Sequence, residues 1–189
     1  MKGKWKSIAT MGLGGIAANL VMIVSLPIIS RLYSPEAYSA YIFLLSLSLF
    51  FSVLGAFRYE LSIVLAESVS QAATLFYITA ILSFLSAIIS FFLLPFLAPI
   101  LRWSHLSELK DWLWIISVMI FSQGLFQVSW SWLTRNKEFT VLAIAQVIPN
   151  LLTVSLQIGL ALYGINDFSG LSLGTIGGSV GTAVPLFLF

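Results

Sequence analysis

The segment QAATLFYITAILSFLSAIISFFLL, residues 71–94, contains no charged side chain. A transmembrane α-helix needs about 20 predominantly apolar residues to cross the hydrocarbon core of a bilayer. The segment lacks the alternation of apolar and polar residues that marks the strands of membrane β-barrels. Lipid also offers no partner for the backbone groups of an open strand. We therefore predict that residues 71–94 form a membrane-spanning helix.

The rest of the chain has the same character. Of its 189 residues, 59% are hydrophobic and 8% are charged, whereas a soluble domain carries about 25% charged residues. The sequence therefore predicts an all-α, polytopic bundle of transmembrane helices, with five complete spans and a sixth that reaches the C-terminus. Besides residues 71–94, the expected spans are residues 7–32, 37–66, 112–134, 140–163 and 171–189.

The composition argues against several classes of function. The formal net charge is only +2, which does not suggest nucleic-acid binding. Cysteine is absent and His105 is the lone histidine, so we expect no disulfide, metal site or cofactor. The segment 102–111 carries His105, Glu108 and Asp111, but no nucleophile or third group that would organise acid–base catalysis. The chain is not expected to be an enzyme.

The distribution of Lys and Arg predicts the orientation, because cytoplasmic segments are enriched in these residues. With the N-terminus in the cytoplasm, the cytoplasmic side carries Lys2, Lys4, Lys6, Arg135 and Lys137, with Arg58 close to it. The opposite side carries Arg31, Arg102 and Lys110. We therefore expect a cytoplasmic N-terminus.

Polar residues follow helical spacing within several expected spans. In residues 140–163, Gln146, Asn150, Thr153 and Gln157 fall on one helical face. Similar stripes are Thr79, Ser83, Ser86 and Ser90; Ser48, Ser52, Gly55, Tyr59 and Ser62; and Gln123, Gln127 and Thr134, together with Trp130. These stripes indicate either helix–helix contacts or the wall of a hydrated cavity, in which Gln146 and Asn150 would contact substrate.

Glycines recur in the last span, where Gly174 with Gly178 and Gly177 with Gly181 form small-xxx-small pairs. Such pairs allow close approach of helix backbones. Tight packing is one interpretation, and a flexible gate is the other.

Arg58 and Glu60 are charged residues inside the expected span 37–66. A charge deep in a span costs about 2.5–3.5 kcal/mol on insertion scales, and less near an end. On a continuous helix, residues two apart point in different directions, so we expect each of the two to need another partner. Either the two lie at the membrane interface, or Arg58 meets an anionic substrate group and Glu60 pairs with another helix or titrates.

Several motifs resemble one transporter family. They are Leu26-Pro27, the hexapeptide at residues 31–36 (RLYSPE), the tetrapeptide at residues 58–61 (RYEL), WLTRNKEFTVLAIAQVIPNLL (residues 132–152) and GLSLGTIGGSVGT (residues 170–182). Together they resemble the polysaccharide flippases for O-antigen and capsule repeat units. These belong to the multidrug/oligosaccharidyl-lipid/polysaccharide exporter superfamily. Ser39 stands where the family usually has glycine after the Pro-Glu turn.

The resemblance covers the first of the family's two helix bundles. It implies that residues 1–189 are the N-terminal bundle of a flippase of the bacterial inner membrane. The flippase would move undecaprenyl-diphosphate-linked oligosaccharide for lipopolysaccharide or capsule synthesis. It also implies that cationic residues receive the diphosphate, with Arg58 first and Arg31 second among the candidates, and Glu60 in ion coupling or in a structural role.

Two alternatives stay open. A drug/cation antiporter of the same superfamily would favour acidic cavity residues, and Glu60 is the only carboxylate inside an expected span. The last span reaches Phe189 without flanking anchors, so the chain is expected to be truncated. A non-functional fragment is then the second alternative, because the facing C-terminal bundle would be missing.

Overall fold

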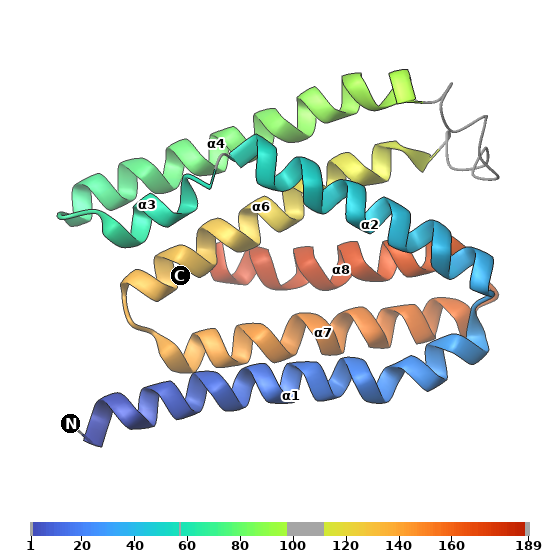
Figure 1. The fold of residues 1–189 in the computed structure, drawn as a ribbon, viewed down its shortest axis with the longest axis horizontal. Coiled ribbons are helices and arrows are strands. Elements are labelled where there is room, and N and C mark those ends of the chain that lie inside the picture. Colours follow the sequence, from blue (N-terminus) through green and yellow to red (C-terminus); the bar gives the residue numbers. More distant parts are fainter. Residues whose placement is uncertain (1, 57, 98–111, 188–189) are drawn as a thin grey trace.

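The fold is all-α, as predicted, in the computed structural model, which describes residues 2–56, 58–97 and 112–187. Seven α-helices and a short 3-10 helix make up the described part (Figure 1). They are α1 (Lys2–Leu32), α2 (Pro35–Ala56), α3 (Glu60–Leu65), α4 (Val69–Leu93), η1 (Leu94–Leu97), α6 (Trp114–Arg135), α7 (Phe139–Leu162) and α8 (Phe168–Phe187).

Four segments within the described residues are long and apolar enough to cross a membrane: Ala9–Leu32, Pro35–Leu54, Val69–Phe96 and Phe139–Leu162. They make the chain a multi-pass membrane protein. The expected runs at 112–134 and 171–189 overlap the helices α6 and α8, which are not among these four. For α6 the reason is its composition, because four serines and two glutamines lower its hydropathy, and half of its residues are buried against other helices.

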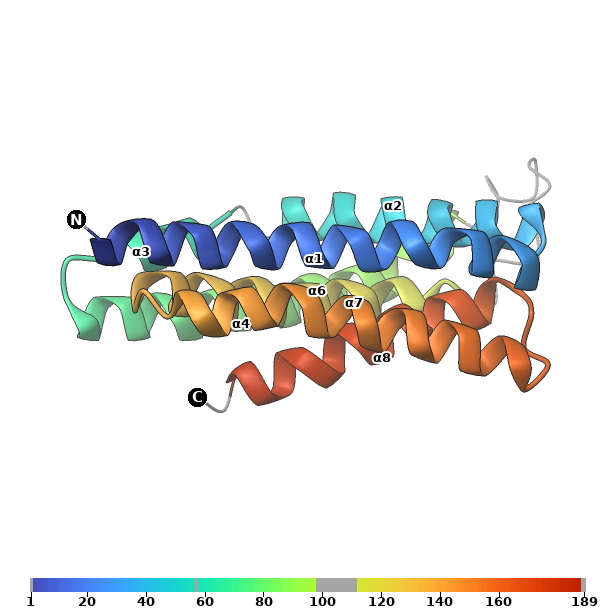
Figure 2. The ribbon, with the colours of Figure 1, turned by 90° about the horizontal axis from the view of Figure 1, so that it is seen from below.

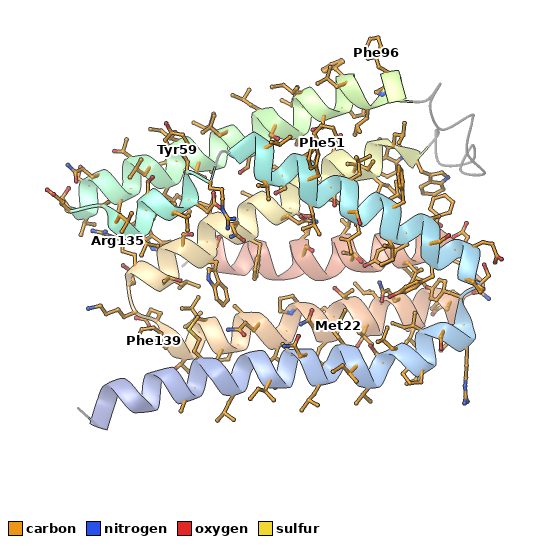
Figure 3. All side chains as sticks on the ribbon, in the orientation of Figure 1. Met22, Phe51, Tyr59, Phe96, Arg135 and Phe139 are labelled. Carbon is orange, nitrogen blue, oxygen red and sulfur yellow. The ribbon has the colours of Figure 1, made fainter. Side chains whose placement is uncertain are left out.

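The helices pack around α6. Contacts join α6 to α2, α3, α4 and α8, while α1 packs along α7 and α7 along α8 (Figures 1 and 2). The other faces of α1 and α4 expose large apolar side chains, as lipid requires. Examples are Leu13, Ile16, Leu20 and Ile23 on α1, and Ile81, Phe84, Ile89 and Phe92 on α4. Phe96, just after α4, points away from the bundle (Figure 3).

The connections between the helices lie alternately at the two ends of the bundle. The start of α1, the α3–α4 connection and the α6–α7 connection lie at one end of the bundle, and the α1–α2 and α7–α8 connections lie at the other (Figure 1). Arg135 and Lys137 therefore share an end with the N-terminus, and Arg31 lies at the opposite end. Arg102 and Lys110, which entered the prediction of orientation, and the whole segment 102–111 lie outside the described residues.

The expected continuous span at residues 37–66 is wrong, because two helices replace it. Helix α2 ends at Ala56 and α3 begins at Glu60. Between them Arg58 has a φ of 55°, in the left-handed region, which a non-glycine residue enters at a cost of about 1–2 kcal/mol. Backbone outside a helix is tolerated at membrane depth where it lines a cavity or is covered by protein. The break between α2 and α3 satisfies that condition, as shown below.

Helix α3 is held in place by Arg135 at the end of α6 (Figure 3). The Arg135 guanidinium donates to the backbone carbonyls of Ile63, at 3.3 Å, and of Ala66. These carbonyls lie at the C-terminal end of α3, where a cation is favoured by the partial negative charge of the helix end. Beside them Ile63 packs with Ala72 and Val128, all three fully buried. The short helix is thus fixed to α6 and α4.

The end of the bundle opposite the N-terminus is filled by a hydrophobic core. Its buried members include Ile29, Tyr41, Leu44, Leu94, Ile115, Ile116, Met119, Ile120 and Leu171. The Tyr33 hydroxyl donates to the carbonyl oxygen of Gln157 at 2.7 Å and so ties the end of α1 to α7. Burial, with a smaller effect from the Asp167 carboxylate, raises the pKa of Tyr33 above its ordinary value of 10.0. The hydroxyl therefore keeps its proton at neutral pH.

The glycines of α8 lie against α7. A Cβ atom added at Gly174 would come within 2.5 Å of the Gln157 side chain, and one at Gly178 within 2.8 Å of the Pro149 carbonyl oxygen. Real Cβ atoms do not make such contacts. The tight-packing interpretation of these glycines is therefore confirmed at both positions.

Candidate functional site

A cavity of about 780 Å³, lined by both polar and apolar residues, lies among the helices. This volume is within the range of about 300–1,000 Å³ that is common for ligand sites. All seven described α-helices contribute to its wall, together with Arg58 in the break between α2 and α3. Its polar lining residues are Asn19, Ser52, Arg58, Glu60, Thr79, Ser83, Gln123, Gln127, Gln146, Asn150 and Ser179. The cavity therefore unites residues from most of the predicted polar stripes.

The polar face of α7 has two parts. Gln146 and Asn150 line the cavity, and the Asn150 amide donates to the Gln146 carbonyl oxygen at 3.1 Å. Gln157 is buried instead, where its amide donates to the Leu171 carbonyl oxygen at 3.0 Å and to the Thr175 hydroxyl at 3.3 Å. One part of the stripe thus makes helix–helix contacts and the other lines the cavity, while contact of Gln146 and Asn150 with substrate stays a prediction.

The stripe of α4 is divided in the same way. Thr79 and Ser83 line the cavity, whereas Ser86 and Ser90 are buried without lining it. The hydroxyls of Thr79 and Ser83 donate to backbone carbonyls four residues earlier, at 2.7 and 2.9 Å. Gly124 lies so close that an added Cβ would come within 2.5 Å of Ser83. On this helix, small polar residues serve close packing even beside the cavity.

Arg58 and Glu60 form an ion pair at the helix break. Arg58 Nε lies 3.7 Å from Glu60 Oε1, a distance too long for a hydrogen bond. The expectation that the two could not neutralise each other is wrong, because it assumed a continuous helix. The left-handed backbone at Arg58 breaks the helix between the two side chains.

The two partners differ in accessibility. The Arg58 side chain is 59% exposed, whereas that of Glu60 is 6% exposed. Glu60 Oε2 has no hydrogen-bond partner. The cavity wall therefore presents an accessible cation and, beside it, a buried carboxylate with one free oxygen.

The remaining predicted site residue, Arg31, lies elsewhere. It is in the last turn of α1, exposed, and not among the described residues that line the cavity. Along α1, its position is about 18 Å from that of Asn19, at 1.5 Å per residue. The structure thus brings Arg58, Glu60, Gln146 and Asn150 to one cavity and leaves Arg31 near the other end of the bundle.

Several lining residues were not among the predicted site residues. Asn19, Gln127 and Trp130 belong to this group. The four-residue spacing of Gln123 and Gln127 was a usable signal, because it marks one polar face of α6. The role of Arg135 had no local signal, since its partner carbonyls are about 70 residues away in the chain.

Comparison with protein-family models assigns the chain to a family. Residues 28–177, most of the sequence, match the model of a family described as polysaccharide biosynthesis protein. The chain belongs to this family. It is a flippase-type family of the multidrug/oligosaccharidyl-lipid/polysaccharide exporter superfamily, transporter-like and generally not enzymatic. Comparisons with curated proteins and with solved structures found no match.

Membership in the polysaccharide biosynthesis family confirms the resemblance drawn from the motifs at residues 31–36 and 58–61, both inside the matched region. In the described ranges, no cluster of three or more His, Asp or Glu side chains is placed to hold a metal ion. The expectation of no metal and no cofactor stays a prediction.

Proposed function

We propose that this chain is the N-terminal bundle of a flippase that moves undecaprenyl-diphosphate-linked oligosaccharide across the bacterial inner membrane. The observation that carries the proposal is the place of Arg58, which lines the cavity at the break between α2 and α3. Broken helices commonly form the substrate sites of secondary transporters. Family membership supports a lipid-linked glycan as the substrate, and we take its link to the lipid to be an anionic diphosphate.

Arg58 receives the diphosphate in this proposal. It is the only Lys or Arg among the described lining residues, and more than half of its side chain is accessible. A guanidinium binds phosphate oxygens with two parallel hydrogen bonds. Gln146 and Asn150 contact the same substrate from α7, while Arg31 would act near the outer end of the path.

Glu60 positions Arg58 or takes the coupling ion. Its Oε1 is 3.7 Å from Arg58 Nε, and its free Oε2 keeps a second role open. In the same proposal α6 and α8 complete six spans, the N-terminus is cytoplasmic, and a facing helix bundle closes the pathway by alternating access.

The test uses the full-length protein in cells whose surface polysaccharide depends on it. Arg58→Ala is expected to abolish the surface polysaccharide at an unchanged level of protein in the membrane. Arg58→Lys should retain part of it, because the charge is kept but the two-pronged geometry is lost. Lys137→Ala, which removes an exposed cation outside the cavity, is the control and should leave polysaccharide normal. Normal polysaccharide in Arg58→Ala would remove Arg58 from the mechanism.

A drug/cation antiporter is the second candidate, because Glu60 is a buried cavity carboxylate with an unpartnered oxygen. An antiporter would confer resistance to cationic drugs, and Glu60→Gln would abolish that resistance. If Glu60→Gln left drug resistance unchanged but reduced surface polysaccharide, the antiporter would be rejected in favour of the flippase.

A further inference from the structure

The wall of the cavity formed by α1, α6 and α7 is neutral and rich in carboxamides. Asn19 on α1, Gln127 on α6 and Gln146 on α7 all line it. In the described part of the chain, none of these three side chains makes a hydrogen bond to protein. Each carboxamide offers two donors and an oxygen acceptor. The wall therefore presents several paired donors and acceptors that a ligand or water must satisfy.

Trp130 adds an aromatic face to the same wall. Its ring lies beside that of Phe126, with ring centroids 6.0 Å apart and a tilt of 34°, and both residues line the cavity. No hydrogen bond of the Trp130 indole N–H is found among the described residues. An indole combines a large apolar face with one polar edge, so it suits a ligand with both apolar and hydroxyl-bearing surfaces.

Two of the carboxamides lie on other helices than those that flank Arg58. Asn19 and Gln146 come from α1 and α7, which pack against each other, whereas Arg58 lies in the break between α2 and α3 (Figure 1). A ligand that reaches both Arg58 and these carboxamides would have an anionic part near Arg58 and a neutral, polyhydroxylated part near the amides.

We propose that Asn19, Gln127, Trp130 and Gln146 form a sugar subsite that reads the pyranose attached directly to the diphosphate. This inference rests on the proposed function and goes beyond it by assigning specificity to these residues. A sugar hydroxyl both donates and accepts hydrogen bonds, so neighbouring hydroxyls pair with one carboxamide. The C–H face of the ring packs on the indole. A site that binds hydroxyls in this way favours the sugar that carries them, because a ligand without the hydroxyl leaves a carboxamide of the wall unpaired in the complex.

The test measures binding to the purified full-length protein in lipid nanodiscs. The two probes are undecaprenyl diphosphate carrying one N-acetylhexosamine and undecaprenyl diphosphate without sugar. Gln127→Leu, Gln146→Leu and Trp130→Leu should each weaken binding of the sugar-bearing probe about three- to tenfold, with unchanged binding of the sugar-free probe. Arg58→Ala should weaken binding of both. Trp114→Leu is the matched control, since Trp114 is 44% exposed and outside the cavity.

Each remaining outcome decides a different claim. Unchanged binding of the sugar-bearing probe in all three variants would overturn the subsite and show that water alone fills this wall. Weaker binding of both probes by Arg58→Ala would still support the proposed function in that case. Equal weakening of both probes would assign the residues a structural role and also overturn the subsite. Equal affinity of the unmodified protein for the two probes would do the same. Failure of the unmodified protein to bind either probe would overturn the proposed function itself.

Discussion

Replacing Gly178 by alanine is expected to destabilise the bundle through the contact between α7 and α8. The new Cβ would lie 2.0 Å from the Thr153 hydroxyl, 2.8 Å from the Pro149 carbonyl oxygen and 2.9 Å from the Thr153 backbone nitrogen. The Thr153 hydroxyl can turn away, but the two backbone atoms cannot. Ordinary contacts begin at 3.4 Å, so α7 and α8 must separate by roughly 0.5–0.6 Å.

The magnitude follows from two opposing effects. Overpacking of this kind costs about 1–3 kcal/mol, and contact with rigid helix backbone places Gly178→Ala in the upper half of that range. Alanine is better than glycine in a helix by about 1 kcal/mol. The net loss of unfolding free energy is therefore about 1–2 kcal/mol, or a fall in Tm of roughly 2–8 °C.

Gly181→Ala is the matched control in the same helix. Its Cβ would be 3.5 Å from Leu152 Cδ1, an ordinary contact, so the helix preference of alanine should leave stability unchanged or slightly higher. The assay is the thermal unfolding of both variants of the full-length protein in detergent. If Gly178→Ala were as stable as Gly181→Ala, the close approach of α7 and α8 would be refuted.

Three further predictions concern the ends of the helices. Arg135→Met removes the guanidinium that binds the C-terminal carbonyls of α3. The rate of backbone hydrogen exchange in α3 should rise at least severalfold, while the rate in α7 stays constant. Unchanged exchange in α3 would contradict the attachment of α3 to Arg135. Tyr33→Phe removes the bond to the Gln157 carbonyl and should lower stability by about 1 kcal/mol in thermal unfolding, so an unaltered Tm would show that the bond contributes nothing. Reporter fusions should read cytoplasmic at Lys137 and external at His105, and the reverse pattern would invert the orientation.

The long helices could be predicted because their cause is local. A run of about 20 apolar residues without charge has few options in lipid other than a helix. Residues 71–94 therefore agree closely with α4, and residues 140–163 with α7. The polar faces were also predictable, since they follow from helical spacing. Gln146 and Asn150 do line the cavity.

The helix break was not predicted, because residues 57–59 contain no proline or glycine to mark it. The run from Ala37 to Ala66 reads as one apolar segment, and the left-handed conformation of Arg58 depends on what surrounds it. Arg135, which lies 69 residues beyond Ala66 in the sequence, donates to the Ala66 carbonyl and so helps to hold α3 in place. Long-range partners of this kind leave no trace in a local pattern, so the pairing of Arg58 with Glu60 was misjudged as well.

For this protein the sequence by itself determined that lipid surrounds the chain, that the fold is all-α, and which residue types lie on each face of a helix. Those properties follow from hydrophobicity and helical period, which act over a few turns. Only the tertiary structure decided which polar face meets another helix and which meets a cavity, as the division of α7 between Gln146 and Gln157 shows. The physical reason is that burial depends on several helices at once, and their mutual approach is set by contacts such as Gly178 against Thr153.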